Sequence, residues 1–286
     1  MSFKIFTDST ADLDEQWAID NQVGLLGLSI EMDGQAYKTV GPDRITNSFL
    51  IEKMQAGAKP TTSQVNVGQF EEAFSAYAKE GTPILYLAFS SVLSGTYQSA
   101  TIAREMILEK YPDARIEVID TLAASLGEGY LAMLAVEARD AGKSLDEAKA
   151  LLEDVVPRLR TYFLVDDLYH LMRGGRLSKS SAIIGSLANI KPLLWLDTEG
   201  KLVPLSKTRG RKKGMKEMFN QASQDLDHTT ALVAHAEDPE AAESLKEQLL
   251  AKDGIDKVIV LPLGPVITSH VGPGTLAVFT VGNQAR

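Results

Sequence analysis

The sequence predicts an α/β protein with two domains, the first with a mainly parallel sheet flanked by helices and the second with a mixed sheet and helices. The chain has 286 residues, more than the ~150 residues of a common domain. Short apolar runs alternate with helical segments, which is typical of β-α-β units. Pro157 and Thr161 mark the end of the first region, and hairpins mix with crossovers beyond them. We therefore expect domains at 1–158 and 159–286.

The elements of the first domain follow from apolar periodicity and from capping residues. A strand at 3–7 runs into Asp8-Ser9-Thr10, whose side chains suit a helix start. Asp33-Gly34 supplies positive φ for a tight hairpin between strands at 23–32 and 35–40. The other expected elements are helices around 45–55 and 68–79, a buried strand at 83–89, a helix ending near Lys110, a strand at 116–120, a helix at 124–141, and a helix that begins with the capping box Ser144–Glu147.

The second domain is expected to combine hairpins with α/β crossovers. Its expected elements are a strand at 162–165, a glycine turn at 173–176, an apolar helix at 180–187, a hairpin of strands 191–196 and 201–207, a basic helix, a strand at 230–235, a helix at 239–251, and strands at 257–263 and 276–281. Residues 258–285 carry no charge, but their prolines and glycines exclude a continuous membrane-spanning helix. We expect two buried strands flanking a loop there, and no transmembrane segment.

Composition and motifs exclude several classes of function. The chain has no cysteine, so disulfide scaffolds and thiolate catalysis are excluded. Its histidines lack metal-ligand spacing, and we expect no metal site. No G-x-x-x-x-G-K-[ST] motif is present, so ATP is not expected to bind in a phosphate loop. The first residues have no apolar run after a basic end, which predicts a cytoplasmic protein without a signal peptide.

The charge of the chain is unevenly distributed. Eleven basic residues lie between Arg173 and Lys216, opposed by Asp197 and Glu199 alone, so this segment carries +9. The net charge of the whole chain is −9, which leaves −18 for the remainder. The asymmetry indicates an anionic ligand, partner or surface, with scattered surface lysines as the alternative. A nucleic acid is not expected, because the remainder repels phosphate and few aromatic residues accompany the basic cluster.

Three clusters of polar side chains follow expected strand ends, where ligands of α/β folds bind. They are Asp8-Ser9-Thr10, Thr61-Thr62-Ser63-Gln64 and the run from Ser91 to Thr96. Hydroxyls and backbone N–H groups at a helix start suit an anion, although such residues also cap helices. Ser94 together with His270, on an expected Gly/Pro loop, suggests a hydrolase as an alternative. A nucleophile elbow, however, requires glycine where Val92 stands.

Five motifs together resemble the DegV family, the fatty-acid-binding subunits of the bacterial fatty acid kinase. In family order they are Thr7–Thr10, Thr62–Gln64, Leu93–Ala100, Arg173–Arg176 and His270–Gly274. The resemblance implies a cytoplasmic lipid-binding carrier that serves phospholipid synthesis and holds one long-chain fatty acid between its two domains. It implies no catalytic residue and no cofactor in this chain. A separate ATP-dependent kinase subunit would convert the carboxylate to an acyl phosphate.

The resemblance also implies roles for individual residues. Fatty acid binding is expected from Thr62, Ser94 and His270 at the carboxylate, with Ser63, Gly95, Thr96 and Arg209. Contact with the kinase subunit is expected from Arg173, Arg209, Arg211 and Lys213. Transient contact with a membrane surface is compatible with this role. Val65 departs from the family, which often has proline there. A standalone Ser/His acyl hydrolase and a small-anion-binding regulatory protein remain the alternatives.

Overall fold

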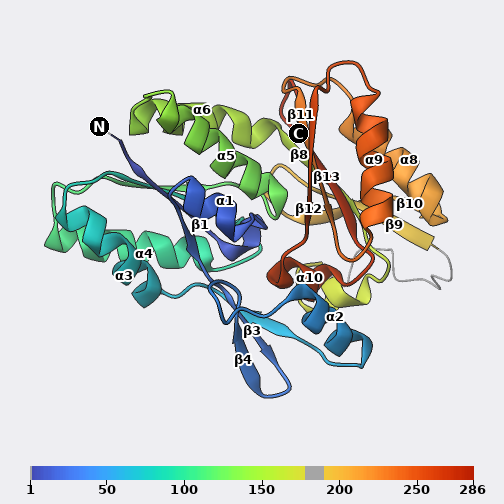
Figure 1. Cartoon of the computed structure of the whole chain (residues 1–286), viewed down its shortest axis with the longest axis horizontal. Coiled ribbons are helices and arrows are strands. Elements are labelled where there is room, and N and C mark those ends of the chain that lie inside the picture. Colours follow the sequence, from blue (N-terminus) through green and yellow to red (C-terminus); the bar gives the residue numbers. More distant parts are fainter. Residues whose placement is uncertain (1, 178–189) are drawn as a thin grey trace.

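The computed structural model describes residues 2–177 and 190–286 and has an α/β fold (Figure 1). Its strands form a four-stranded sheet, a six-stranded sheet and a small three-stranded sheet. The four-stranded sheet is parallel throughout and the six-stranded sheet is mixed, so the predicted fold class is confirmed. The helix expected at 180–187 lies outside the described residues.

The four-stranded sheet is covered by helices on both faces. Its order is β2 (Val23–Leu26), β1 (Lys4–Asp8), β6 (Ile84–Ala88), β7 (Ile116–Asp120). The helices around it are α1 (Glu15–Asp20), α3 (Val67–Lys79), α4 (Thr96–Lys110), α5 (Leu126–Asp140) and α6 (Leu145–Val155). Successive strand residues point to opposite faces. Phe6 and Tyr86 therefore pack with α3 and α4, whereas Ile5 and Leu85 pack with α5 and α6.

The six-stranded sheet is built from the second half of the chain. Its order is β10 (Leu202–Arg209), β9 (Ile190–Leu196), β8 (Leu159–Leu164), β13 (Leu276–Val281), β11 (Thr230–His235), β12 (Lys257–Pro262). Only β11 and β12 pair in parallel. Helices α8 (Arg211–Ala222) and α9 (Pro239–Leu250) cover one face, and α7 (Tyr169–Arg173) follows β8. The 3₁₀ turn η2 (Val156–Arg158) connects α6 to this sheet.

Helix α5 lies between the two large sheets and contacts both (Figure 1). It packs against β1 and β6 of the parallel sheet and against β8, β11 and β13 of the mixed sheet. Ten of its residues are buried, and most of these are glycine, alanine or leucine. A helix with most of its residues buried and apolar is typical of a core position. The two sheets therefore share one core.

The expected strand at 23–32 is wrong, because the chain forms two strands in different sheets. β2 pairs with β1 only as far as Asp8 and Leu26, where β1 turns into η1 (Ser9–Ala11). The backbone N–H of Leu28 instead donates to Ser9 Oγ at 3.1 Å. The chain then enters the small antiparallel sheet, whose members are β4 (Gln35–Lys38), β3 (Ser29–Met32) and β5 (Thr61–Ser63), beside α2 (Asn47–Gln55).

Local turn and cap signals from the sequence are confirmed. Asp33 and Gly34 connect β3 to β4 with φ of 53° and 77°, as a tight hairpin requires. Ser144 and Glu147 form the expected capping box at the start of α6. The loop from Asp197 to Gly200 connects the antiparallel strands β9 and β10.

The loop expected between the last two strands is wrong, because it contains helix α10 (Pro265–Val271). Pro265 stands at the first helical position, where its missing N–H costs no hydrogen bond. His270 consequently lies in the last turn of a helix rather than on a Gly/Pro loop. The flanking strands β12 and β13 are as expected. Across residues 2–177 and 190–286, no helix has the length and apolar character needed to cross a membrane.

Three carboxyl groups are buried where β1 meets α5, and burial raises the pKa of each. Thr10 Oγ1 lies 2.5 Å from Asp8 Oδ1 and 2.8 Å from Glu128 Oε2. A hydroxyl has one proton to donate, so Thr10 cannot fully satisfy both carboxyl groups. Asp12 hydrogen-bonds to Ser125 Oγ at 2.6 Å, and burial raises its pKa to about 8. The first polar cluster of the sequence is thus part of the buried interior.

Asp12 should make the folded protein less stable as pH rises. The folded state keeps a proton up to about pH 8, whereas the unfolded chain releases it near the ordinary carboxyl pKa of 3.8, so the free energy of unfolding falls across this interval. We expect Asp12→Asn, which suits the φ of 53° at this position, to reduce the slope of unfolding free energy against pH between neutrality and pH 8. Urea unfolding at several pH values measures it. Equal slopes for parent and variant would contradict the prediction.

Candidate functional site

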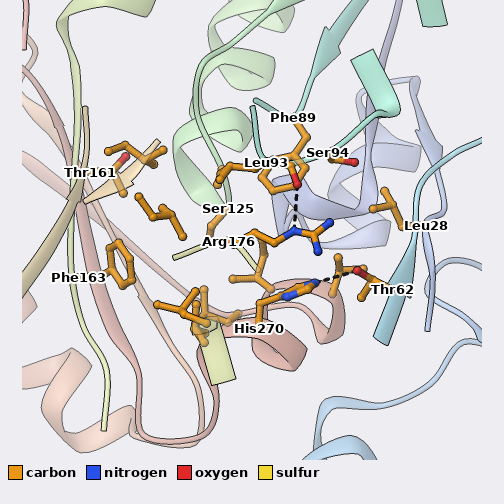
Figure 2. Close-up of a pocket in the computed structure, with 18 of the residues that line it drawn as sticks. Leu28, Thr62, Phe89, Leu93, Ser94, Ser125, Thr161, Phe163, Arg176 and His270 are labelled. Atoms are coloured by element: carbon orange, nitrogen blue, oxygen red, sulfur yellow. Dashed lines mark hydrogen bonds between the residues drawn. The ribbon is translucent and has the colours of Figure 1, made fainter. Parts of the chain in front are cut away.

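A cavity of about 320 Å³ lies between the two large sheets, beyond the N-terminal end of α5 (Figure 2). Its walls come from the segment after β6, the start of α5, strands β8 and β13, and helix α10. These elements are far apart in the sequence. Helix α5 fills the space between the sheets along its own length, and the cavity lies where the helix has not yet begun. Ala124 and Ser125, just before α5, line the cavity.

Polar side chains gather at one end of the cavity. Figure 2 shows Thr62, Ser94, Arg176 and His270 at this end. Thr62 Oγ1 and His270 Nε2 share a hydrogen bond of 2.8 Å, which joins β5 to α10. Ser94 Oγ lies 2.9 Å from Thr96 Oγ1 and accepts from the Thr96 backbone N–H at 3.2 Å, at the start of α4. These contacts hold the hydroxyls of Thr62 and Ser94 in place at the polar end of the cavity.

The Arg173–Arg176 motif is shaped around His270. A Cβ atom at Gly174 would lie 2.4 Å from His270 Nδ1, so only glycine allows this approach. Arg176 then reaches back across the cavity, donating from Nε to the Leu93 carbonyl at 3.1 Å and from Nη1 to the Gly174 carbonyl at 2.6 Å. Both of these acceptors are backbone carbonyls, so the hydrogen bonds leave the guanidinium charge without a carboxylate partner.

The electrostatics of this end favour an anion. Burial, followed by the nearby Arg176 and Arg173 guanidinium groups, lowers the pKa of His270 to about 4. Burial also lowers the pKa of Arg176. An incoming negative charge would offset both effects, because it stabilises the charged forms. Hydroxyls, an imidazole and a guanidinium are together the donors that a desolvated carboxylate or phosphate needs.

The other end of the cavity is buried and mostly apolar. Phe163 and Phe279 lie here with Leu196, each at most 5% exposed. Val266 and Ile267 of α10 form part of the floor. The cavity can therefore hold a long apolar body whose one end is anionic. A small anion would occupy only the polar end and leave the apolar walls empty.

The structure brings together most of the expected ligand-binding residues. Five of them line the cavity, namely Thr62, Ser63, Ser94, Gly95 and His270. Thr96 is buried behind Ser94 and positions it. Arg209 is exposed at the end of β10 and does not line the cavity. Arg176 lines the cavity, and no role was expected for it from the sequence. Its place in the Arg173–Arg176 motif was the available signal.

The residues expected to contact a kinase subunit differ in their surroundings. Arg173 donates to the Ser269 carbonyl at 3.4 Å, next to His270. Arg211 stands in the first turn of α8 and pairs with Asp166 and Asp238, so its charge is largely offset. Lys213 is exposed on the same helix.

The geometry does not provide the contact that a Ser/His hydrolase requires. Ser94 hydrogen-bonds to Thr96, and His270 hydrogen-bonds to Thr62. A nucleophile needs its base within hydrogen-bonding reach, and this pair does not form here. Among the described residues, no group of three or more His, Asp or Glu side chains is arranged to hold a metal ion.

Comparison with known proteins decides the family. The family model described as "Uncharacterised protein, DegV family" matches residues 2–283. The chain belongs to the DegV family. A DegV domain-containing protein of Streptococcus pyogenes serotype M1 is 59% identical over 286 residues, which is 100% of both chains.

Solved structures of this family are similar over their whole length. A DegV family protein from Thermus thermophilus, described for its fatty acid binding, is 32% identical with a TM-score of 0.89, and the match covers 99% of this chain and 100% of that one. DegV from Bacillus subtilis, described as a fatty acid binding protein, is 29% identical with a TM-score of 0.85 and the same coverage. The resemblance drawn from the sequence motifs is therefore confirmed at the level of the family.

His270 should remain uncharged in the folded protein at neutral and mildly acidic pH. Its pKa falls from 6.5 to about 4, so the unfolded chain binds more protons in this interval and the folded state loses stability as pH decreases through it. We expect the imidazole ¹⁵N shifts of His270, assigned by their loss in His270→Gln, to stay those of a neutral ring down to about pH 5. A titration centred near pH 6.5 would contradict this.

Proposed function

We propose that the protein binds one long-chain fatty acid in the cavity and presents its carboxylate to a separate ATP-dependent kinase subunit, which forms the acyl phosphate. The observation that carries the proposal is a cavity with hydroxyl, imidazole and guanidinium groups together at one end and mostly apolar side chains along its other walls. The fatty acid binding described for the Thermus thermophilus and Bacillus subtilis relatives supports the ligand class.

The apolar body supplies most of the binding free energy in this proposal. Burying ~14 methylenes at ~0.8 kcal/mol each gives about 11 kcal/mol before the cost of ordering the chain. The carboxylate loses its hydration, and this cost is offset by charge-assisted hydrogen bonds from Thr62, Ser94, His270 and Arg176. The polar end therefore orients the acid, and the apolar end retains it.

The chain needs a partner for phosphoryl transfer in this proposal. Its sequence contains no G-x-x-x-x-G-K-[ST] phosphate loop, and the cavity end where the carboxylate would lie includes the exposed side chains of Ser63 and Gln64. A kinase subunit could approach there. Arg209, Lys212 and Lys213 are exposed around the N-terminus of α8 and suit an acidic partner surface. A cytoplasmic location and transient contact with a membrane, from which the acid would be drawn, belong to the same proposal.

The domain division at 158/159 also belongs to the proposal. All strands of the parallel sheet precede residue 158, and all strands of the six-stranded sheet follow it. The ligand would then bind between the domains, which share the core around α5.

Removing a donor at the polar end should weaken binding of the fatty acid. We expect Thr62→Ala, Ser94→Ala and His270→Ala each to cost ~1.5–3 kcal/mol, the contribution of a hydrogen bond to a charged group. Ser91→Ala is the matched control, because Ser91 is exposed on the same loop as Ser94 and does not line the cavity. Titration of the delipidated protein with a fluorescent fatty acid, followed by displacement with palmitate, measures the loss.

Parent-like binding and acyl phosphate formation in all three variants would show that the carboxylate site is elsewhere. If the purified parent hydrolyses an acyl ester and Ser94→Ala abolishes that activity, the hydrolase alternative is correct instead. Mass spectrometry of lipid released from denatured protein identifies the acid carried from the host.

Charge reversal on α8 should separate kinase contact from lipid binding. Lys212→Glu with Lys213→Glu removes two exposed cations without breaking an ion pair, and we expect slower association with the kinase subunit at low salt and unchanged fatty acid binding. Lys79→Glu with Lys252→Glu, two exposed lysines outside α8, is the control for net charge. Arg211→Glu should also destabilise the fold, because it breaks the contacts with Asp166 and Asp238. Salt-independent, parent-like association of the double variant would refute this surface.

A further inference from the structure

Strand β8 places one polar residue on an otherwise apolar face. Leu159 and Phe163 belong to the core shared with α5, and Tyr162 and Leu164 pack on the opposite side with α8 and α9. Because side chains alternate along a strand, Thr161 faces the same side as Leu159 and Phe163. It lines the cavity and is 4% exposed. A valine would have the same shape there and no polar atom.

The hydroxyl of Thr161 has no hydrogen-bond partner in the described part of the chain. Two other buried threonines are satisfied: Thr275 Oγ1 donates to the Val271 and Gly272 carbonyls at 3.1 and 3.0 Å, and Thr280 Oγ1 donates to the Ala222 carbonyl at 2.8 Å. Thr268 Oγ1 on α10 also has no partner, but Thr268 does not line the cavity. A buried hydroxyl without a partner destabilises the fold. A group absent from the protein itself would therefore complete this position.

Thr161 lies at the end of the cavity opposite the carboxylate site. Figure 2 shows Thr161 and Phe163 on one side and Thr62, Arg176 and His270 on the other. A fatty acid whose carboxylate is held at the polar end would extend its chain toward Thr161. The hydroxyl would then meet a carbon of the acyl chain far from the carboxylate.

A water molecule is a poor partner for this hydroxyl. Ordered buried water needs two to four polar contacts. Leu159 and Phe163 lie on the same face of β8 as Thr161, and Phe279 is its partner on β13. A Cβ atom at Gly127 of α5 would lie 3.4 Å from Thr161 Oγ1. These four residues have no polar side-chain atom.

We propose that Thr161 forms a polar subsite for an oxygen substituent on the acyl chain, so that the substrate class of this protein includes fatty acids with a hydroxyl or oxo group far from the carboxylate. The inference rests on the proposed function, because the carboxylate must be held at the polar end. Thr161 donates to an oxo oxygen, and it both donates to and accepts from a hydroxyl. An unsubstituted chain leaves the hydroxyl unpaired and gains only its apolar contacts.

The test compares affinities of the delipidated full-length protein for octadecanoic acid and for its monohydroxy isomers, with the hydroxyl at successive positions in the distal half. For at least one isomer, we expect the affinity relative to that for octadecanoic acid to be higher in the parent than in Thr161→Val. The ratio of affinities for that isomer and the unsubstituted acid should fall about three- to tenfold in Thr161→Val, the value of one hydrogen bond. Thr161→Ser keeps the hydroxyl and should keep the preference.

Thr280→Val is the matched control, since it removes a buried hydroxyl from β13 outside the cavity and should leave the ratio unchanged. If Thr161→Val does not fold, Thr161→Ala provides the hydroxyl-free comparison with Thr161→Ser. An unchanged ratio at every position overturns the polar subsite, while tight binding of octadecanoic acid by the same proteins still upholds the proposed function. Failure of the parent to bind any of the acids overturns both.

Discussion

The burial of α5 between two sheets is the constraint on which the rest of the structure depends. Two sheets of different topology contact the same helix, so its side chains must be small enough for both to approach. Close packing of this kind leaves few voids, and the cavity opens only where the helix has not yet begun. The buried carboxyl groups at the same end, Asp8, Asp12 and Glu128, are held by hydroxyls from β1, η1 and the residue before α5. The packing of α5 and the hydrogen bonds of these carboxyl groups together therefore define the edge of the cavity.

The polar end of the cavity is assembled from segments that meet only in the folded chain. Thr62 and His270 are 208 positions apart, yet they share one hydrogen bond. Arg176 completes the group by reaching Leu93 from the segment after α7. Each donor is held by a different element, so its position does not depend on the ligand. Preorganised donors need little rearrangement when a charge arrives, which lowers the cost of binding it.

The sequence predicted what local patterns determine. The buried strand β6, the Asp33-Gly34 hairpin and the Ser144 cap depend on neighbouring residues only. The end of β2 at Leu26 depends instead on where β1 stops, and α10 is hidden in an uncharged stretch that also suits a loop. The hydroxyls and His270 were found through motifs. The apolar lining could not be predicted, because Phe163 and Phe279 are no different in sequence from core residues. Only the position of α5 makes them walls of the cavity.

The small side chains of α5 also bear on how this fold can diverge. A larger residue at Ala132 or Ala135, both fully buried, would displace the elements packed around α5. A change at Leu202 or Val266 alters one wall of the cavity and leaves the contact between the sheets intact. We therefore expect descendants of this chain to explore new cavity shapes through β10 and α10 while their central helix stays nearly fixed, so that the protein can acquire a different ligand without first acquiring a different fold.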